Sequence, residues 1–175
     1  VINIKRGQLY TLGSKADIPI DVNLRFKGIK KGAKVKIDDG KLAFRVNNII
    51  SSSKIEIQSK NSGKISPKKG VNISGLKINL PTVDRKDLKF VKMAIELDFD
   101  WIAMSFVRDK DDRAKVDELL NKNKKIIPII AKIEKPEAID NLDDIICSFD
   151  GILVARGDLG LELELEQVPS LQKKI

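Results

Sequence analysis

Residues 129–160 hold the pattern that most restricts the fold, a strand, a helix and a second strand in close succession. Two short apolar runs, 126–133 and 151–155, predict the strands, and each run ends abruptly in charged residues. Strands joined by a single helix lie parallel in one sheet, so their carboxyl ends meet at the same edge. The sequence therefore predicts a parallel α/β unit with charged side chains gathered at that edge.

A lysine and two carboxylates follow these strands. Lys132 and Glu134 are two residues apart, so an extended chain projects them from the same face, and Asp158 comes just after the second strand. A lysine at a strand end can stabilise or protonate an enolate, or form a Schiff base. Glu134 and Asp158 are candidate ligands for Mg²⁺ or Mn²⁺. The structural alternatives are a Lys132–Glu134 ion pair and an Asp158 cap on the following segment.

Two glycine-containing segments are candidate anion sites. The turn 155–160 contains Gly157 and can aim backbone N–H groups at a carboxylate or phosphate, although it can equally be a tight loop. The segment Lys68-Lys69-Gly70 can bind the phosphates of a nucleotide, or can form one more part of a basic surface.

Composition excludes several classes of site. The 175 residues contain no histidine, so a metal must be held by oxygen ligands, which favours a hard cation over zinc. Cys147 is the only cysteine, which rules out an internal disulfide and fits a reducing compartment. No run approaches the length of a membrane span and the first residues carry no signal pattern, so we expect a cytoplasmic protein.

Charge and periodicity divide the chain in two. The net charge is +12 over residues 1–80 and −4 over residues 81–175. The first part shows short alternating runs between glycine turns and no helical period, which predicts a small β-barrel or sandwich, with a hairpin at Asp38-Asp39-Gly40. The predicted strands of this part are 1–4, 18–22, 34–37, 42–46, 54–57 and 71–78.

The second part alternates helices and strands. Helices are predicted after Asp84, after Asp109, from Pro136 through Ile145, and over 168–175. The strands between them are 101–107, 126–133 and 151–155. Three strands cannot close a barrel, so we expect this part to belong to something longer.

Six motifs occur in an order that resembles the pyruvate kinase family. They are IDDG at 37–40, KKGVN at 68–72, LP with an acid-capped helix at 80–87, MSFVR at 104–108, AKIE at 131–134 and DGILVARGDLG at 150–160. The resemblance covers the whole chain. It implies a multi-domain α/β protein in which residues 1–79 form an all-β barrel, the lid, and residues 80–175 form part of a (β/α)₈ catalytic barrel.

The same resemblance implies a function, transfer of the phosphoryl group of phosphoenolpyruvate to ADP, giving pyruvate and ATP in the last step of glycolysis. Lys132 would be catalytic and substrate-binding, and the backbone of Gly157 and Asp158 would hold the substrate carboxylate. Glu134 and Asp158 would be the ligands of Mg²⁺ or Mn²⁺, and Lys69 would bind the nucleotide. The resemblance further implies K⁺, with ligands mostly outside these residues, and a homotetramer that binds neither nucleic acid nor membrane.

The chain also departs from the family pattern. Glu164 stands where a proline is usual, and the phosphoryl-binding arginine and most K⁺ ligands of the family are not in this sequence. We therefore expect this segment alone to be inactive. Two alternatives remain at this stage, a Mg²⁺-dependent or Schiff-base aldolase or lyase acting on enolates, and a basic β-barrel that binds anions or RNA.

Overall fold

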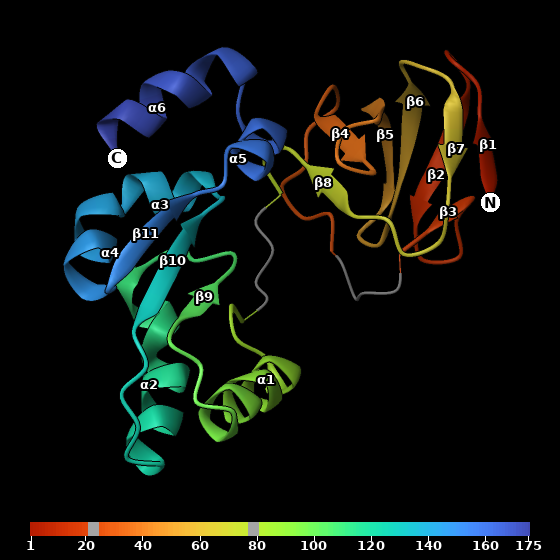
Figure 1. The fold of residues 1–175 in the computed structure, drawn as a ribbon. Helices are drawn as coiled ribbons and strands as arrows, with labels where there is room; N and C mark the ends of the chain where they lie inside the picture. The colour runs from red at the N-terminus through yellow and green to blue at the C-terminus, as the bar shows by residue number, and fades with distance from the viewer. Residues whose placement is uncertain (21–24, 77–80) are drawn as a thin grey trace. The chain divides into compact units, whose positions relative to one another are not determined.

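The computed structural model describes residues 1–20, 25–76 and 81–175 (Figure 1). The chain divides into two compact units, Val1–Asn79 and Leu80–Ile175. Each unit has a hydrophobic core of its own. The sequence boundary at Asn79-Leu80 falls outside the described residues. No helix in the described ranges is long and apolar enough to cross a membrane.

The first unit is built mainly from antiparallel β-structure, with one parallel pairing between neighbouring strands. Six strands form one sheet in the order β3-β2-β6-β5-β4-β8, and β1 pairs with β7. Alternation places every second side chain on the core: in β6, Ile55, Ile57 and Ser59 are buried. The strands are β1 (Ile2–Ile4), β2 (Leu9–Gly13), β3 (Ile18–Pro19), β4 (Lys34–Ile37), β5 (Leu42–Ser51), β6 (Lys54–Ser59), β7 (Gly63–Ile65) and β8 (Val71–Ile73).

The predicted hairpin is confirmed. β4 and β5 pair antiparallel, and Asp38, Asp39 and Gly40 between them all have positive φ. The prediction of six strands was wrong, because β2 and β7 were missed. The ends of two predicted strands, at Val22 and Ile78, lie outside the described residues.

The second unit is a three-stranded parallel sheet with helices between the strands. The strand order is β11-β10-β9, and both pairings are parallel, as the sequence predicts. The elements are α1 (Arg85–Glu96), β9 (Ile102–Met104), η1 (Lys110–Arg113), α2 (Ala114–Lys122), β10 (Ile129–Ile133), α3 (Pro136–Asp140), α4 (Leu142–Ser148), β11 (Gly151–Val154), α5 (Arg156–Glu162), η2 (Leu165–Gln167) and α6 (Val168–Lys174).

The start of α1 follows from capping. Asp84 accepts hydrogen bonds from the backbone of Lys86 and Asp87 and forms a capping box with Asp87, as expected for the N-cap of α1. The single helix predicted from Pro136 was wrong, because it breaks into α3 and α4 at Asn141. The Asn141 side chain donates to the carbonyl oxygen of Arg108, 3.0 Å away, which fixes the break against the neighbouring loop.

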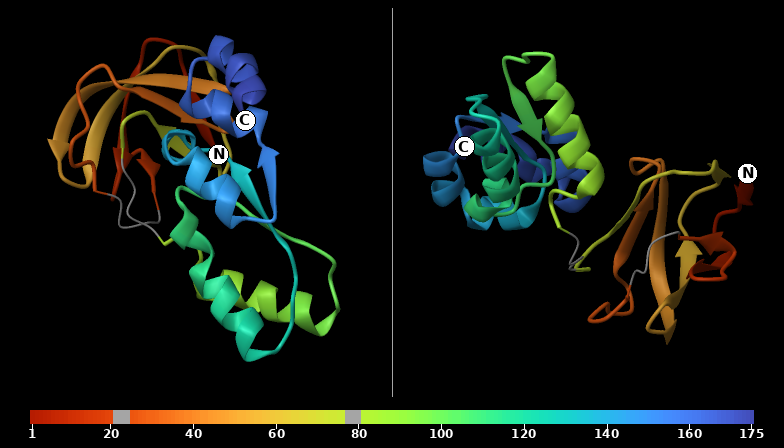
Figure 2. Two further views of the ribbon diagram at one scale, coloured as in Figure 1. Left: turned by 90° about the vertical axis from the view of Figure 1, so that its left-hand side faces the viewer. Right: turned by 90° about the horizontal axis from the view of Figure 1, so that it is seen from below.

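The helices cover one face of β10. Ile129, Ala131 and Ile133 are fully buried on that face among residues of α1, α2, α4 and α5. Helices α1 and α2 lie side by side beneath the sheet (Figures 1 and 2). Ile130 and Lys132 alternate onto the opposite, partly exposed face. The sheet therefore presents Lys132 on the face away from the core.

Candidate active site

Lys132 and Glu134 meet at the carboxyl end of β10. The Lys132 Nζ lies 2.6 Å from Glu134 Oε1 and donates to Ser105 Oγ at 3.0 Å. Glu134 is only 2% exposed, whereas the Lys132 side chain is 27% exposed. The two side chains share a face, as predicted. An ammonium held beside a buried carboxylate and still open to solvent can contact an anionic ligand.

The turn after β9 supplies a second donor to Glu134. The strand predicted over 101–107 ends already at Met104, because Phe106 has φ of 58° and cannot continue a strand. The Phe106 N–H donates to Glu134 Oε2 at 3.1 Å. Sequence reasoning missed Phe106, and no pattern in the sequence indicates its backbone angle. Both carboxylate oxygens of Glu134 are thus held by donors from two strand ends.

The end of β11 is tied to β10 and leads directly into α5. The Ala155 N–H donates to the carbonyl oxygen of Ile133 at 3.2 Å. Gly157 and Asp158 fall in the first turn of α5, where no side chain caps the helix. Backbone N–H groups in a first turn have no partner within the helix and favour anions. Asp158 is exposed, and no hydrogen bond or ion pair joins it to Glu134 among the described residues.

The two glycines of α5 have different surroundings. A Cβ on Gly160 would come within 2.7 Å of Leu165 Cδ2, so packing against the next segment accounts for that glycine. A Cβ on Gly157 would meet no atom within 4 Å. Glycine inside a helix is unfavourable relative to alanine, so Gly157 is not explained by packing. Its open side leaves room for a ligand to approach the backbone closely.

The carboxylate oxygens of Glu134 and Asp158 suit a cation that keeps most of its bound waters. The described parts of the chain contain no group of three or more His, Cys, Asp or Glu residues that could hold a metal by themselves. Mg²⁺ commonly binds through one or two carboxylates, with water and substrate oxygens completing its shell. Each oxygen of Glu134 accepts one hydrogen bond and keeps a further lone pair. Glu134 and Asp158 are both carboxylates, the protein groups that Mg²⁺ and Mn²⁺ accept.

Two further charged side chains border this edge. The Lys135 Nζ contacts Glu162 Oε1 in α5 and lies 5.7 Å from the centroid of the Phe106 ring. The sequence gives a weak signal for Lys135, which follows Glu134 directly, and none for Glu162. Their contact links the segment after β10 to α5 and so fixes the two strand ends relative to each other.

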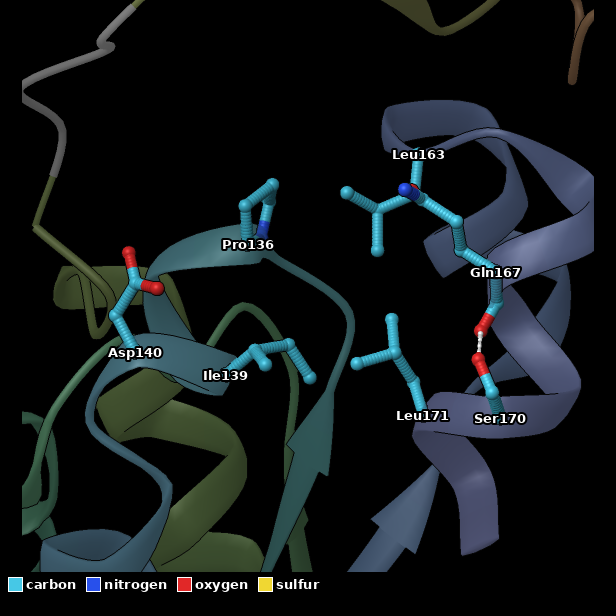
Figure 3. A pocket seen from close by; sticks show the side chains of 7 residues that line it. All are labelled: Pro136, Ile139, Asp140, Leu163, Gln167, Ser170 and Leu171. Atoms are coloured by element: carbon cyan, nitrogen blue, oxygen red, sulfur yellow. Dashed lines mark hydrogen bonds between the residues drawn. The ribbon is translucent and has the colours of Figure 1, made fainter. Parts of the chain in front are cut away.

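A hollow of about 300 Å³ lies elsewhere in the same unit, between α3 and the segment containing η2 and α6 (Figure 3). At the α6 side of the hollow, the Ser170 hydroxyl donates to the carbonyl oxygen of Gln167 at 2.8 Å. The residues that line it are Pro136, Ile139, Asp140, Leu163, Gln167, Ser170 and Leu171. None of the predicted site residues is among them, and the lining is mostly apolar.

The first unit holds Lys69 through the hairpin of β4 and β5. Asp38 Oδ1 lies 2.9 Å from the Lys69 Nζ, and the Asp38 N–H donates to the carbonyl oxygen of Gly70 at 3.1 Å. Lys41 adds a weaker contact to the same carboxylate at 3.5 Å. The hydrogen bond from Lys69 lowers the pKa of Asp38 below its ordinary range, and Asp38 raises the pKa of Lys69. Asp38 therefore binds the lysine segment through both backbone and side chain.

This ion pair makes the stability of the first unit depend on pH. Because the pKa of Asp38 is lower in the folded chain than its unfolded value of about 3.9, the ionised carboxylate stabilises the fold above that value. The stabilisation is lost as the pH falls through the folded-state pKa. We expect Asp38→Asn to lower the free energy of unfolding at neutral pH and to match the wild type at the acid end. Urea unfolding from neutral pH down to about pH 2 measures this difference.

Asp39→Asn is the matched control for this experiment. Asp39 is exposed in the same turn, and both positions have positive φ, which asparagine tolerates, so neither substitution adds backbone strain. An equal pH profile for the two variants would show that the Lys69 pair is not the cause.

Comparison with known proteins finds one family over most of the chain. The family model described as "Pyruvate kinase, barrel domain" matches residues 2–175. The chain is 41% identical over 143 residues to the pyruvate kinase of Mycobacterium tuberculosis strain H37Rv, a match that covers 82% of the chain and 30% of the relative. It is 36% identical over 182 residues to that of Thermotoga maritima, covering 99% of the chain and 38% of the relative.

A third relative gives the same result. The pyruvate kinase of Methanocaldococcus jannaschii is 37% identical over 172 residues, covering 97% of the chain and 38% of the relative. The chain thus spans about a third of the length of these relatives, from 30% to 38%. The family model and these relatives agree over most of the 175 residues. The chain belongs to the pyruvate kinase family.

Proposed function

We propose that the complete protein containing these residues transfers the phosphoryl group of phosphoenolpyruvate to ADP, giving pyruvate and ATP. The observation that carries the proposal is the Lys132–Glu134 pair at the carboxyl end of the central parallel strand. Parallel α/β proteins place their active sites at that edge of the sheet. Membership in the pyruvate kinase family supports the reaction class.

The chemistry explains the need for these charges. The bond between phosphorus and the enol oxygen of phosphoenolpyruvate breaks, and a new bond forms from phosphorus to a β-phosphate oxygen of ADP. The enolate that remains takes a proton on its terminal carbon and becomes pyruvate. Such transfer depends on positioning and charge neutralisation more than on covalent catalysis. Lys132, held by Glu134 and Ser105 and partly exposed, would supply positive charge to the phosphoryl group and the enolate.

The remaining site residues take complementary roles in this proposal. Glu134 and Asp158 would hold Mg²⁺ or Mn²⁺, which when bound neutralises charge on the phosphoryl oxygens. The first-turn N–H groups of Gly157 and Asp158 would bind the substrate carboxylate, and the open space beside Gly157 supports a close approach. Lys69, positioned by Asp38, would bind the phosphates of the nucleotide.

The same proposal assigns a place in the complete fold to each of the two units. Residues 1–79 would be the lid, and the three parallel strands of the second unit would be part of a (β/α)₈ barrel. K⁺, a homotetramer, a cytoplasmic location and inactivity of this segment alone stay predictions from the resemblance.

A turnover assay tests the proposal. The complete chain should form pyruvate from phosphoenolpyruvate only when both ADP and Mg²⁺ or Mn²⁺ are supplied, with one ATP made for each pyruvate. The segment 1–175 assayed alone should form none. Pyruvate release without ADP, or no release under any of these conditions, would contradict the proposed reaction.

The two alternatives lose support from the family membership. A Schiff-base aldolase would be trapped on Lys132 by borohydride in the presence of pyruvate, and we expect no adduct. A stand-alone RNA-binding module would show a steep loss of RNA affinity with salt for residues 1–79. The aromatic rings of Tyr10, Phe26 and Phe44 are buried in that unit, which leaves them unable to stack on bases.

A further inference from the structure

Phe106 has a backbone conformation that its side chain does not explain. Seven non-glycine residues in the described ranges have positive φ, and the six besides Phe106 are aspartates and lysines: Lys15, Asp38, Asp39, Lys68, Asp98 and Lys124. A bulky aromatic residue in the left-handed region is a real outlier and costs free energy. Phe106 is 56% exposed, so burial of its side chain does not hold the backbone in place.

A hydrogen bond to Glu134 accounts for the conformation. The Phe106 N–H donates to Glu134 Oε2 at 3.1 Å, and Glu134 is 2% exposed. Hydrogen bonds to an ionised carboxylate are stronger than neutral ones, and a buried carboxylate is costly without donors. The free-energy cost of the left-handed backbone at Phe106 is therefore offset by the hydrogen bond that its N–H donates to Glu134.

The consequence is a carboxylate fixed from two sides. Lys132 holds Oε1 from β10 and the Phe106 N–H holds Oε2 from the turn after β9. We propose that Phe106 is a positioning residue whose left-handed backbone orients Glu134 to bind the divalent cation. The inference rests on the proposed role of Glu134 in metal binding and deepens it. Residues that orient a metal ligand typically change metal affinity by about 10–100-fold when they are replaced.

A graded series of substitutions separates the backbone from the ring. Phe106→Gly, Phe106→Asn, Phe106→Ala and Phe106→Ile all remove the ring, but they differ in how well they adopt positive φ. Glycine and asparagine do so readily, alanine less so, and β-branched isoleucine least. Asparagine and isoleucine have the same number of side-chain heavy atoms and form the matched pair.

The measurement is Mn²⁺ affinity of the complete chain by electron paramagnetic resonance, which needs no turnover. We expect near wild-type affinity for Phe106→Gly and Phe106→Asn, weaker binding for Phe106→Ala, and a loss of about 10–100-fold for Phe106→Ile. Circular dichroism checks that each variant folds. If Phe106→Ile does not fold, the order of the other three still decides the question.

The variant Glu134→Gln is the control that tests the metal site itself. It separates an error about Phe106 from an error about the proposed function. If the wild type binds Mn²⁺, Glu134→Gln does not, and Phe106→Ala and Phe106→Ile bind like the wild type, the positioning role is overturned while the metal site stands. If affinity drops equally in all four Phe106 variants, the ring and not the backbone is responsible, which also overturns the inference. Wild-type binding that Glu134→Gln leaves unchanged, or no wild-type binding, would overturn both.

Discussion

Lys132→Met in the complete chain is expected to lower kcat by about a thousandfold while phosphoenolpyruvate still binds. The Lys132 Nζ is held between Glu134 Oε1 and Ser105 Oγ at the strand end, so its charge is placed before the substrate arrives. Methionine keeps much of the side-chain volume but removes the charge that neutralises the enolate and the phosphoryl group. Steady-state kinetics give kcat, and isothermal titration with phosphoenolpyruvate gives binding separately.

Two controls separate a loss of catalysis from a loss of folding. Lys122→Met removes a lysine that is exposed in the last turn of α2 and should leave kcat unchanged. Lys132→Met also leaves the Glu134 charge buried without its ion partner, which costs about 3 kcal/mol of stability. Thermal unfolding shows whether the variant is folded at the assay temperature. A folded Lys132→Met variant with near-normal kcat would exclude the role given to Lys132.

The double variant Glu134→Gln/Asp158→Asn is expected to abolish Mn²⁺ binding to the segment 1–175. In the wild-type segment we expect Mn²⁺ to bind and to bind more tightly when phosphoenolpyruvate is present, because substrate oxygens complete the shell that two carboxylates leave open. Removing both charges leaves only neutral amide oxygens at the site. Electron paramagnetic resonance titration with and without phosphoenolpyruvate measures both effects.

Single variants show which carboxylate matters. Glu134 is buried and held by two donors, whereas Asp158 is exposed in the first turn of α5, so Glu134→Gln should have the larger effect. Asp143→Asn is a suitable control, because Asp143 is exposed in the first turn of α4. Unchanged Mn²⁺ binding in the double variant would remove these two residues as ligands. Absence of binding to the wild-type segment would show that the site needs parts of the complete chain.

The local pattern predicted most of the second unit. Apolar runs bounded by charge indicated the three strands, and capping residues such as Asp84 indicated where helices begin. The parallel pairing followed because a single helix joins consecutive strands. The errors occurred where distant contacts override local preference. Asn141 breaks a helix by donating to Arg108, and β2 is stabilised by pairing with β6, more than forty residues away in the sequence.

The sequence by itself determined which side chains gather at one edge of the second unit. A period of two places Lys132 and Glu134 on one face, and the parallel crossover brings Asp158 to the same end of the sheet. Only the tertiary structure decided how Glu134 is held, because its second donor is a backbone N–H whose direction depends on the φ of Phe106. The side on which each side chain of a strand projects follows directly from the order of the residues. The left-handed backbone of Phe106, in contrast, depends on a hydrogen bond to a carboxylate 28 residues away, so the local sequence does not predict it.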